Sequence, residues 1–261
     1  MTSPKLRTVR GVKEPYPLGE FPKGFVHIVA GEISAALAIG RMDIEGKDWE
    51  QIFAKAIGAQ WRPSTVGLDD ILIPALSAAW GAKTVKNNHP FRATRLRLIS
   101  GRNSPTYSYD VSDIRSQDPA ELGALVVGIW NERVAALYQK YKTLRTVVLI
   151  KGPQFKEITI FERPTIRYNP QEYNWSWNTN NNLVATDEEG KGKFTWQPHG
   201  SQFTIHETVP DNALNIEIYP PTVIADKILE TIGFNENSYR IVPRVNPLPD
   251  TDPEDDQDDI D

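Results

Sequence analysis

The sequence predicts a mixed α/β fold in which helices flank a central sheet, followed by a β-rich C-terminal part. Between residues 31 and 163, apolar segments with helical spacing alternate with short strand-like runs, in the order helix, three strands, helix and two strands. After Pro164 the composition shifts towards Asn, Trp, Tyr, Gln and Gly, and further short strands follow. The chain has 261 residues, which suits one large domain with an elaborated second half.

Composition and charge divide the chain into four predicted segments. These are an irregular arm rich in Pro and Gly (1–30), the α/β core (31–163), the β-rich part of the same domain (164–245) and an acidic tail (246–261). The last twelve residues hold seven Asp and one Glu, and without them 26 acidic residues face 29 basic ones, so the net charge of -5 comes from the tail. We expect the tail to be solvated and disordered. The alternative is that it mimics nucleic acid and competes for a basic groove.

Two predicted helices carry clear start signals. Asp48 is followed three residues later by Gln51, which is the spacing of a capping box, and apolar residues then mark one helical face up to Ile57. Asp118 can cap a second helix, with Pro119 at its first position, and this helix is predicted to run to about Tyr141. Weaker patterns predict helices at residues 31–40 and 223–232.

Short apolar runs bounded by turn residues predict the strands. In residues 95–99, Leu96 and Leu98 alternate with Arg95 and Arg97, which indicates a strand with one wet face. The predicted strands cover residues 71–74, 78–85, 95–99, 146–150 and 157–161 in the core, and 193–196, 202–206 and 215–218 in the β-rich part.

Acids and one lysine are distributed over the first helix and the first two strands. Glu50 lies in the helix at the border of its apolar face, Asp69 and Asp70 open the first strand, and Lys83 lies in the second strand after the apolar run 78–82. A buried ammonium group needs a partner, so we expect a carboxylate or a phosphate beside Lys83. Carboxylates that hold a divalent ion, together with a lysine that orients water, are the groups that phosphodiester hydrolysis requires.

In this arrangement the chain resembles the PD-(D/E)XK nuclease superfamily, and its type II restriction endonucleases in particular. The resemblance spans roughly residues 30–220 and includes the segments 80–86, 99–105 and 196–205. It implies a restriction-endonuclease-like core in which Asp70 binds metal, Lys83 assists the water and Glu50 is a helical catalytic glutamate. The family has an acid two residues before the lysine, where this chain has Gly81. The second metal-binding acid would then be Glu50 or Asp69, or the enzyme would use fewer carboxylates.

The activity implied by this resemblance is Mg²⁺-dependent, sequence-specific cleavage of double-stranded DNA. A palindromic target would imply a homodimer, and the resemblance also implies a cognate DNA methyltransferase that protects host DNA. Arg can pair with guanine and Asn with adenine, whereas the plain interpretation of Arg102 and Asn103 is a turn after a strand. The candidate DNA-contacting residues are Lys86, Arg102, Asn103, Ser104, Gln197, His199 and Gln202.

Two other functions remain open from the sequence. One is a repair or non-specific nuclease on the same core. The other is a non-enzymatic module that binds nucleic acid or, through its seven Trp residues, carbohydrate. The absence of Cys excludes disulfides and cysteine-ligated zinc. No apolar run approaches about 18 residues and no secretory signal is visible, so we expect a cytoplasmic protein without a membrane span.

Overall fold

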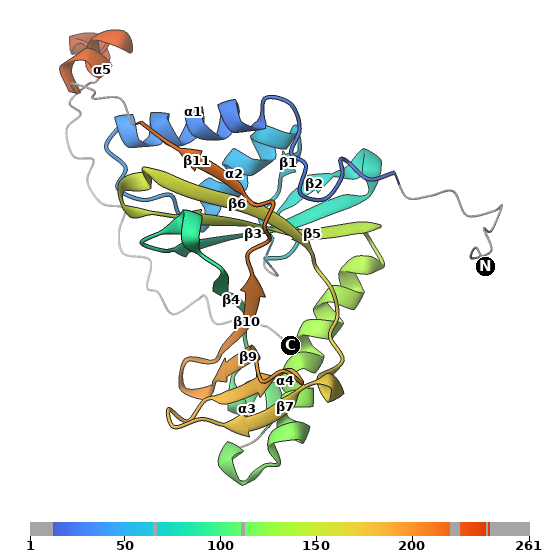
Figure 1. Cartoon of the computed structure of the whole chain (residues 1–261). Coiled ribbons are helices and arrows are strands. Elements are labelled where there is room, and N and C mark those ends of the chain that lie inside the picture. The colour runs from blue at the N-terminus through green and yellow to red at the C-terminus, as the bar shows by residue number, and fades with distance from the viewer. Residues whose placement is uncertain (1–12, 65–66, 111–112, 220–224, 239, 241–261) are drawn as a thin grey trace, which may run out of the picture. The chain divides into compact units, whose positions relative to one another are not determined.

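The computed structural model describes residues 13–64, 67–110, 113–219, 225–238 and 240, which form a mixed α/β structure with two sheets (Figure 1). The chain divides into two compact units, Met1–Pro221 and Thr222–Asp261. Both sheets belong to the first unit, and the second contains the short helix α5 (Ala225–Thr231). In the part of the chain that the structure describes, no helix is long and apolar enough to span a membrane.

The larger sheet has six strands and mixed direction. β3 and β5 pair in parallel, and every other neighbouring pair is antiparallel. Parallel neighbours need a long crossover connection, and the chain between β3 and β5 includes the helix α4 (Pro119–Tyr138). The strands lie in the order β1 (Gln60–Trp61), β2 (Ile71–Ile73), β3 (Ala78–Lys86), β5 (Thr143–Lys151), β6 (Glu157–Pro164) and β11 (Leu214–Glu217).

Two helices cover one face of this six-stranded sheet, α1 (Phe25–Ala38) and α2 (Gly46–Ile57) (Figure 1). Trp49 and Phe53 of α2 and Phe25 of α1 are fully buried against Trp80 of β3. Since successive strand residues point to opposite faces, the neighbours of Trp80 in the strand, Ala79 and Gly81, belong to the other face. This alternation determines on which face the candidate active site lies.

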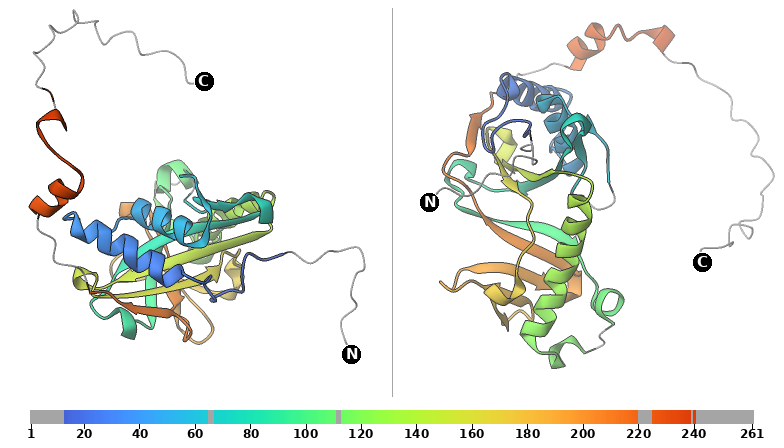
Figure 2. Two further views of the ribbon diagram at one scale, coloured as in Figure 1. Left: turned by 90° about the horizontal axis from the view of Figure 1, so that it is seen from above. Right: turned by 90° about the vertical axis from the view of Figure 1, so that its right-hand side faces the viewer.

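The smaller sheet has five antiparallel strands and packs with α4 on the second face of the six-stranded sheet (Figure 2). Its inner side contributes large aromatic residues, among them Phe194, Trp196 and Phe203, to a core shared with Trp130 of α4. The strands lie in the order β4 (Arg95–Arg102), β10 (Gln202–Thr208), β9 (Gly192–Gln197), β8 (Leu183–Thr186) and β7 (Asn174–Trp177).

Of the two helix starts predicted from capping residues, the one of α4 is confirmed and the one of α2 is wrong. Asp118 caps α4 as expected, because its side chain accepts hydrogen bonds from the N–H groups of Ala120 and Glu121. The predicted capping box at Asp48 is wrong: α2 begins earlier, Glu45 is its N-cap, and the Glu45 N–H donates to Asp48 Oδ2 at 3.0 Å. An acid is favourable anywhere in the first helical turn, so its presence alone does not fix the cap position.

The strand at residues 95–99 exists but belongs to a different sheet from the one expected. β4 pairs with β10 and not with the six-stranded sheet that holds β2 and β3. Conversely, β11 comes from the predicted β-rich part and pairs with β6 in the larger sheet. The pairing therefore crosses the predicted boundary at residue 163 in both directions, because alternation of side chains reveals a strand but not its partner.

Several elements extend beyond the sequence prediction or were missed by it. Helix α1 begins at Phe25, inside the segment predicted as an irregular arm. The short strands β1, β7 and β8 and the five-residue helix α3 (Pro105–Tyr109) were not predicted from the sequence. The predicted acidic tail, 246–261, and the first twelve residues lie outside the described part of the chain.

A buried polar network attaches the N-terminal arm to the six-stranded sheet. The carboxylate of Glu162 accepts hydrogen bonds from the Tyr16 hydroxyl at 2.7 Å and the Trp80 indole at 2.6 Å. Arg145 forms an ion pair with Glu162 at 3.2 Å and a second one with Glu14 at 2.9 Å. The Glu162 side chain is fully buried and Arg145 is 3% exposed, so each charge depends on the other for compensation.

Candidate active site

The structure brings three of the predicted catalytic residues together. Glu50 from α2, Asp70 before β2 and Lys83 in β3 lie close enough to influence one another's pKa. Asp70 directly precedes Ile71, which pairs with Trp80, so Asp70 lies on the same face as Lys83, the face opposite α1. The negative charges of Asp70 and Glu50 therefore act on Lys83, although neither carboxylate forms an ion pair with it in the part of the chain that the structure describes.

Asp70 is the most buried of the three, with 3% of its surface exposed. The Ser64 N–H donates to its Oδ1 at 2.9 Å, and the Arg62 N–H donates to its main-chain oxygen at 2.7 Å. Burial raises the pKa of the Asp70 carboxyl above its ordinary value, although the Ser64 hydrogen bonds and the Lys83 ammonium oppose the rise. An ionised Asp70 is thus held at a cost in stability, which is typical of groups that bind a cation or react.

Lys83 is half-buried and reaches towards the loop before β2, where its Nζ lies 3.5 Å from the carbonyl oxygen of Gly67. Burial lowers the pKa of Lys83, and Arg163 of β6 adds to this effect. Asp70 and Glu50 act in the opposite direction, because their negative charges favour the ammonium form.

Glu50 is held at the edge of the site by a tryptophan that the sequence analysis did not single out. The Trp61 indole N–H donates to Glu50 Oε2 at 2.9 Å. Burial raises the pKa of Glu50; the Trp61 hydrogen bond lowers it, and the negative charge of Asp70 raises it further. Glu50 is half-buried, as expected for a residue at the border of the apolar helix face. One oxygen of its carboxylate thus has a fixed partner.

Gly81 stands where the nucleases that the sequence resembles carry an acid, and the structure gives a steric reason for glycine here. A β-carbon at Gly81 would lie 2.9 Å from the Cα of Leu68 and 3.0 Å from the carbonyl oxygen of Gly67. Both contacts are with main-chain atoms, which cannot turn away as a flexible side chain can. The loop before β2 fills the space that an acidic side chain would need at this position.

We predict that Gly81→Ala lowers the free energy of unfolding by about 1–3 kcal/mol, the usual cost of forcing an extra methyl group into a packed site. Urea denaturation monitored by tryptophan fluorescence measures it. The matched control is Gly31→Ala in the middle of α1, where an added β-carbon meets no atom within 4 Å. That substitution should raise stability by up to about 1 kcal/mol, because alanine favours a helix. Equal effects of both substitutions would contradict the steric explanation.

Asp69 is engaged elsewhere. The Tyr141 hydroxyl donates to its Oδ2 at 3.2 Å, so one carboxylate oxygen contacts the segment after α4. Its negative charge contributes to the raised pKa of Asp70. Of the two acids offered by the sequence as a second ligand, Glu50 is the one whose charge acts on Lys83 and whose pKa is raised by Asp70.

The chemistry of these groups suits a hard divalent cation. Mg²⁺ prefers oxygen ligands and is commonly held by one or two carboxylates, with water and phosphate oxygens completing its shell. Asp70 and Glu50 are such a pair. Among the residues that the structure describes, no group of three or more His, Cys, Asp or Glu side chains is placed to hold a metal ion. The protein's own contribution would thus consist of two carboxylates.

Four of the predicted DNA-contacting residues gather at one end of the five-stranded sheet. Arg102 of β4 is directly opposite Gln202 of β10, and Gln202 is opposite Gln197 of β9. His199 is exposed in the turn that joins β9 to β10. These residues place a guanidinium, two amides and an imidazole at the same end of the sheet.

The other three predicted contacts lie in different surroundings. Asn103 is only 1% exposed, so its side chain is not accessible to a base edge in this conformation. Ser104 caps α3 by accepting from the Tyr107 N–H. Lys86 is exposed and forms an ion pair with Asp43 at 2.8 Å. Asn and Ser are frequent in turns and caps for this reason, and the sequence pattern could not separate the two roles.

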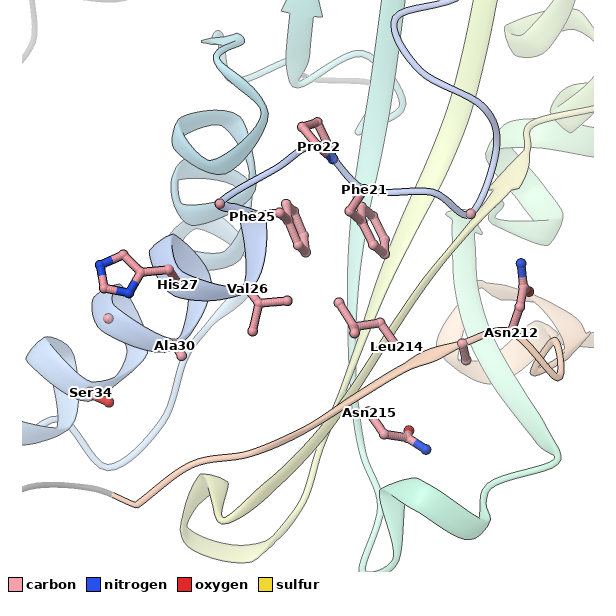
Figure 3. A pocket seen from close by; sticks show the side chains of 14 residues that line it. Phe21, Pro22, Phe25, Val26, His27, Ala30, Ser34, Asn212, Leu214 and Asn215 are labelled. Atoms are coloured by element: carbon pink, nitrogen blue, oxygen red, sulfur yellow. The ribbon is translucent and has the colours of Figure 1, made fainter.

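A large apolar pocket lies between α1 and β11, and none of Glu50, Asp70 and Lys83 lines it (Figure 3). It has a volume of ≈ 930 Å³, and Phe21 and Phe25 stack in its wall with ring centroids 4.1 Å apart. Val26 and Leu214 also line it. No carboxylate or lysine lines this pocket, so it does not offer the ionic chemistry of the Asp70 site.

Trp61 and Arg163 are the site neighbours that sequence reasoning missed. Trp61 follows α2 without any sequence pattern that marks it, and Arg163 lies near the end of β6, far from Lys83 in the chain.

Comparisons of this chain with protein-family models, with curated proteins and with solved structures found no match.

Proposed function

We propose that this chain is a Mg²⁺-dependent endonuclease that cuts double-stranded DNA at a specific sequence. The observation that carries the proposal is the proximity of Glu50 of α2 to Asp70 and Lys83, whose charges act on its pKa, while Asp70 and Lys83 lie on the same face of the six-stranded sheet. Each has a pKa displaced by burial, and the three groups act on one another. Displaced pKa values in such a mixed group are more typical of reactive sites than of surface ion pairs.

Each residue has a distinct role in the proposed reaction. Asp70 and Glu50 would hold the cation, and when bound it would offset charge on the phosphate and promote ionisation of water. Lys83 would hold the attacking water by a hydrogen bond and stabilise negative charge on the phosphate. Water would attack phosphorus and lose one proton to solvent, and the bond from phosphorus to the leaving oxygen would break as that oxygen takes up a proton from solvent.

The order of elements supports a restriction-endonuclease-like core for this activity. A helix with Glu50 precedes two antiparallel strands with Asp70 and Lys83, and a crossover through α4 leads to the parallel strand β5. One feature differs: β4, expected in the same sheet, pairs in the five-stranded sheet. The catalytic residues lie on α2, β3 and the segment before β2, so this difference leaves their placement unaffected.

The row formed by Arg102, Gln202 and Gln197 supports sequence preference, because these side chains can read base edges. A palindromic target would call for a homodimer, since two-fold symmetry in DNA is matched by two-fold symmetry in the protein. A nuclease without sequence preference on the same core is the alternative.

Burial of the tryptophans disfavours carbohydrate binding. Sugar stacking needs exposed indole rings, but four of the seven Trp residues are buried and two, Trp175 and Trp177, are half-buried. Trp61 is 38% exposed, and its N–H is bonded to Glu50. A stacking platform for sugars would therefore have little surface to use.

The test is cleavage of long unmethylated DNA by the full chain with Mg²⁺, beside EDTA and the variant Lys83→Ala. The matched control is Lys156→Ala, which removes an exposed lysine in the turn before β6. We expect discrete fragments from the wild type and the control, and a loss of cleavage on the order of 10³-fold in Lys83→Ala.

The other outcomes are equally informative. A smear that EDTA and Lys83→Ala both abolish would favour the non-specific nuclease. Cleavage that persists in Lys83→Ala would remove Lys83 from the mechanism. No cleavage of several unrelated DNAs would contradict the endonuclease and favour a binding module.

A further inference from the structure

The outer face of the five-stranded sheet is the surface opposite its aromatic core. The pairing of β4 with β10 places Arg97 opposite His206 and Arg95 opposite Thr208 on this face. Alternation assigns to it these positions of the five strands: Arg95, Arg97, Ile99, Arg102, Thr195, Gln197, Gln202, Thr204, His206, Thr208, Val184, Thr186, Asn174 and Ser176. None of these positions holds an Asp or a Glu.

Three arginines on the edge strand β4 give this face its charge. Arg95, Arg97 and Arg102 are all exposed, and within the described residues none of them forms an ion pair with a carboxylate. The nearest turn, between β8 and β9, does contain acids. There Glu189 pairs with Lys191 at 2.6 Å, and Asp187 accepts hydrogen bonds from its own turn. The arginines therefore remain available to an external anion.

His206 lies on this face, and the positive charges around it act on its pKa. Burial lowers the pKa of His206 to about 4, and the charges of Arg95, Arg97 and Lys193 act in the same direction. Its Nε2 lies 3.0 Å from Thr195 Oγ1 on the neighbouring strand. Burial is the main cause of this shift, and the three nearby cations add to it because they disfavour a further positive charge.

We propose that the outer face of the five-stranded sheet binds the phosphate backbone of double-stranded DNA through Arg95, Arg97 and Arg102. This inference deepens the proposed function, on which it rests for the identity of the substrate. It adds Arg95 and Arg97, which come from the first half of the chain, to the polar row at Gln197 and Gln202. Charge complementarity carries it, because a polyanion is the partner that such a row of exposed arginines fits.

The shape and composition of the face favour a duplex over a single strand. Proteins that bind single strands stack bases on exposed aromatic rings, and the outer positions of the five strands contain none. The indoles of Trp175 and Trp177 belong to the opposite face, where they pack against the core. Arg95 and Arg102 are seven residues apart, about 23 Å along a strand. This is about two thirds of one turn of a DNA duplex.

The experiment measures binding of a labelled duplex of mixed sequence, about 30 base pairs or three helical turns, by fluorescence anisotropy in EDTA so that no cleavage occurs. The test variant is Arg95→Gln/Arg97→Gln in the full chain. The charge-matched control is Lys23→Gln/Arg41→Gln, which removes two exposed cations flanking α1 on the other face of the six-stranded sheet. Circular dichroism verifies that both variants remain folded.

We expect the test variant to bind about 100-fold more weakly, roughly tenfold per arginine, and the control to bind like the wild type. Between about 50 and 200 mM salt, the slope of log K against log salt should become shallower by about 1.8, since each lost phosphate contact removes about 0.9. Unchanged affinity and slope would overturn the proposal, and so would a wild type that binds a single strand more tightly than the duplex.

The two proposals can fail separately. The binding measurement in EDTA requires no cleavage, so it tests the arginine face whether or not the protein is a nuclease. A wild type that binds DNA through the arginines but never cuts it would contradict the nuclease and leave the binding face standing. A wild type that cuts DNA, together with an arginine variant of normal affinity, would contradict only the binding face.

Discussion

Replacing Asp70 by asparagine is expected to reduce Mg²⁺-dependent cleavage on the order of 10³-fold while leaving the protein as stable as the wild type or more stable. The carboxylate is needed for activity because it would hold the cation, and an amide is a weaker ligand for Mg²⁺. The same carboxylate is 3% exposed, and burial raises its pKa. The neutral asparagine avoids the burial of a charge, so the folded state gains.

The pH dependence of stability tests the sign of the stability change that we expect for Asp70→Asn. Asp70 has a folded pKa above its unfolded value, so the stability linked to its protonated form is present below the unfolded pKa and is lost as pH rises through the folded pKa. The stability difference between Asp70→Asn and the wild type should thus be largest at neutral pH and shrink in acid. Thermal unfolding at several pH values, beside a cleavage assay, measures both parts.

Asp43→Asn is the matched control with the opposite sign. Burial alone would raise the pKa of Asp43, but hydrogen bonds from Lys151 and Lys86 lower it. Its ionised form therefore stabilises the fold above the unfolded pKa, and this contribution is lost as pH falls through the folded pKa. Asp43→Asn should lower stability at neutral pH. An Asp70→Asn protein that is both fully active and less stable would contradict the role assigned to Asp70.

Arg145→Met is expected to lower the free energy of unfolding by about 3–5 kcal/mol, because it leaves the carboxylate of Glu162 buried without its charged partner. Glu162 is fully buried, and burial raises its pKa although Tyr16, Arg145 and Trp80 all oppose the rise. The substitution also frees Glu14, whose carboxylate binds Arg145 at 2.9 Å. Urea denaturation at neutral pH measures the loss.

A double-mutant cycle separates the lost ion pair from the lost packing. Glu162→Leu in the Arg145→Met background removes the orphaned charge, so the double variant should recover a large part of the stability. The exposed pair of Glu189 and Lys191 is the control, since Lys191→Met should change stability little. If the double variant is less stable than Arg145→Met alone, the uncompensated carboxylate is not the source of the loss.

The sequence predicted the elements whose signals are local. The Asp118 cap, the following Pro119 and the apolar spacing fixed the start of α4, because the cap bonds close within one turn. The strands β3, β5 and β6 appeared as apolar runs close to their observed bounds. Asp70, Lys83 and Glu50 were proposed from their order along the chain, and in the structure they lie close enough for their charges to act on one another. Local backbone preference and burial of apolar residues are sufficient to specify these features.

Only the tertiary structure decided which strands pair and what surrounds the candidate site. The alternation in residues 95–99 is the same whichever sheet the strand joins, so the pairing of β4 with β10 could not be deduced from it. The steric demand at Gly81 comes from the main chain of Leu68, thirteen residues away in the sequence. The links from Trp61 to Glu50 and from Arg145 to Glu162 likewise join side chains that only the packed fold brings together. Such contacts depend on long-range geometry, which the periodicity of a single segment does not contain.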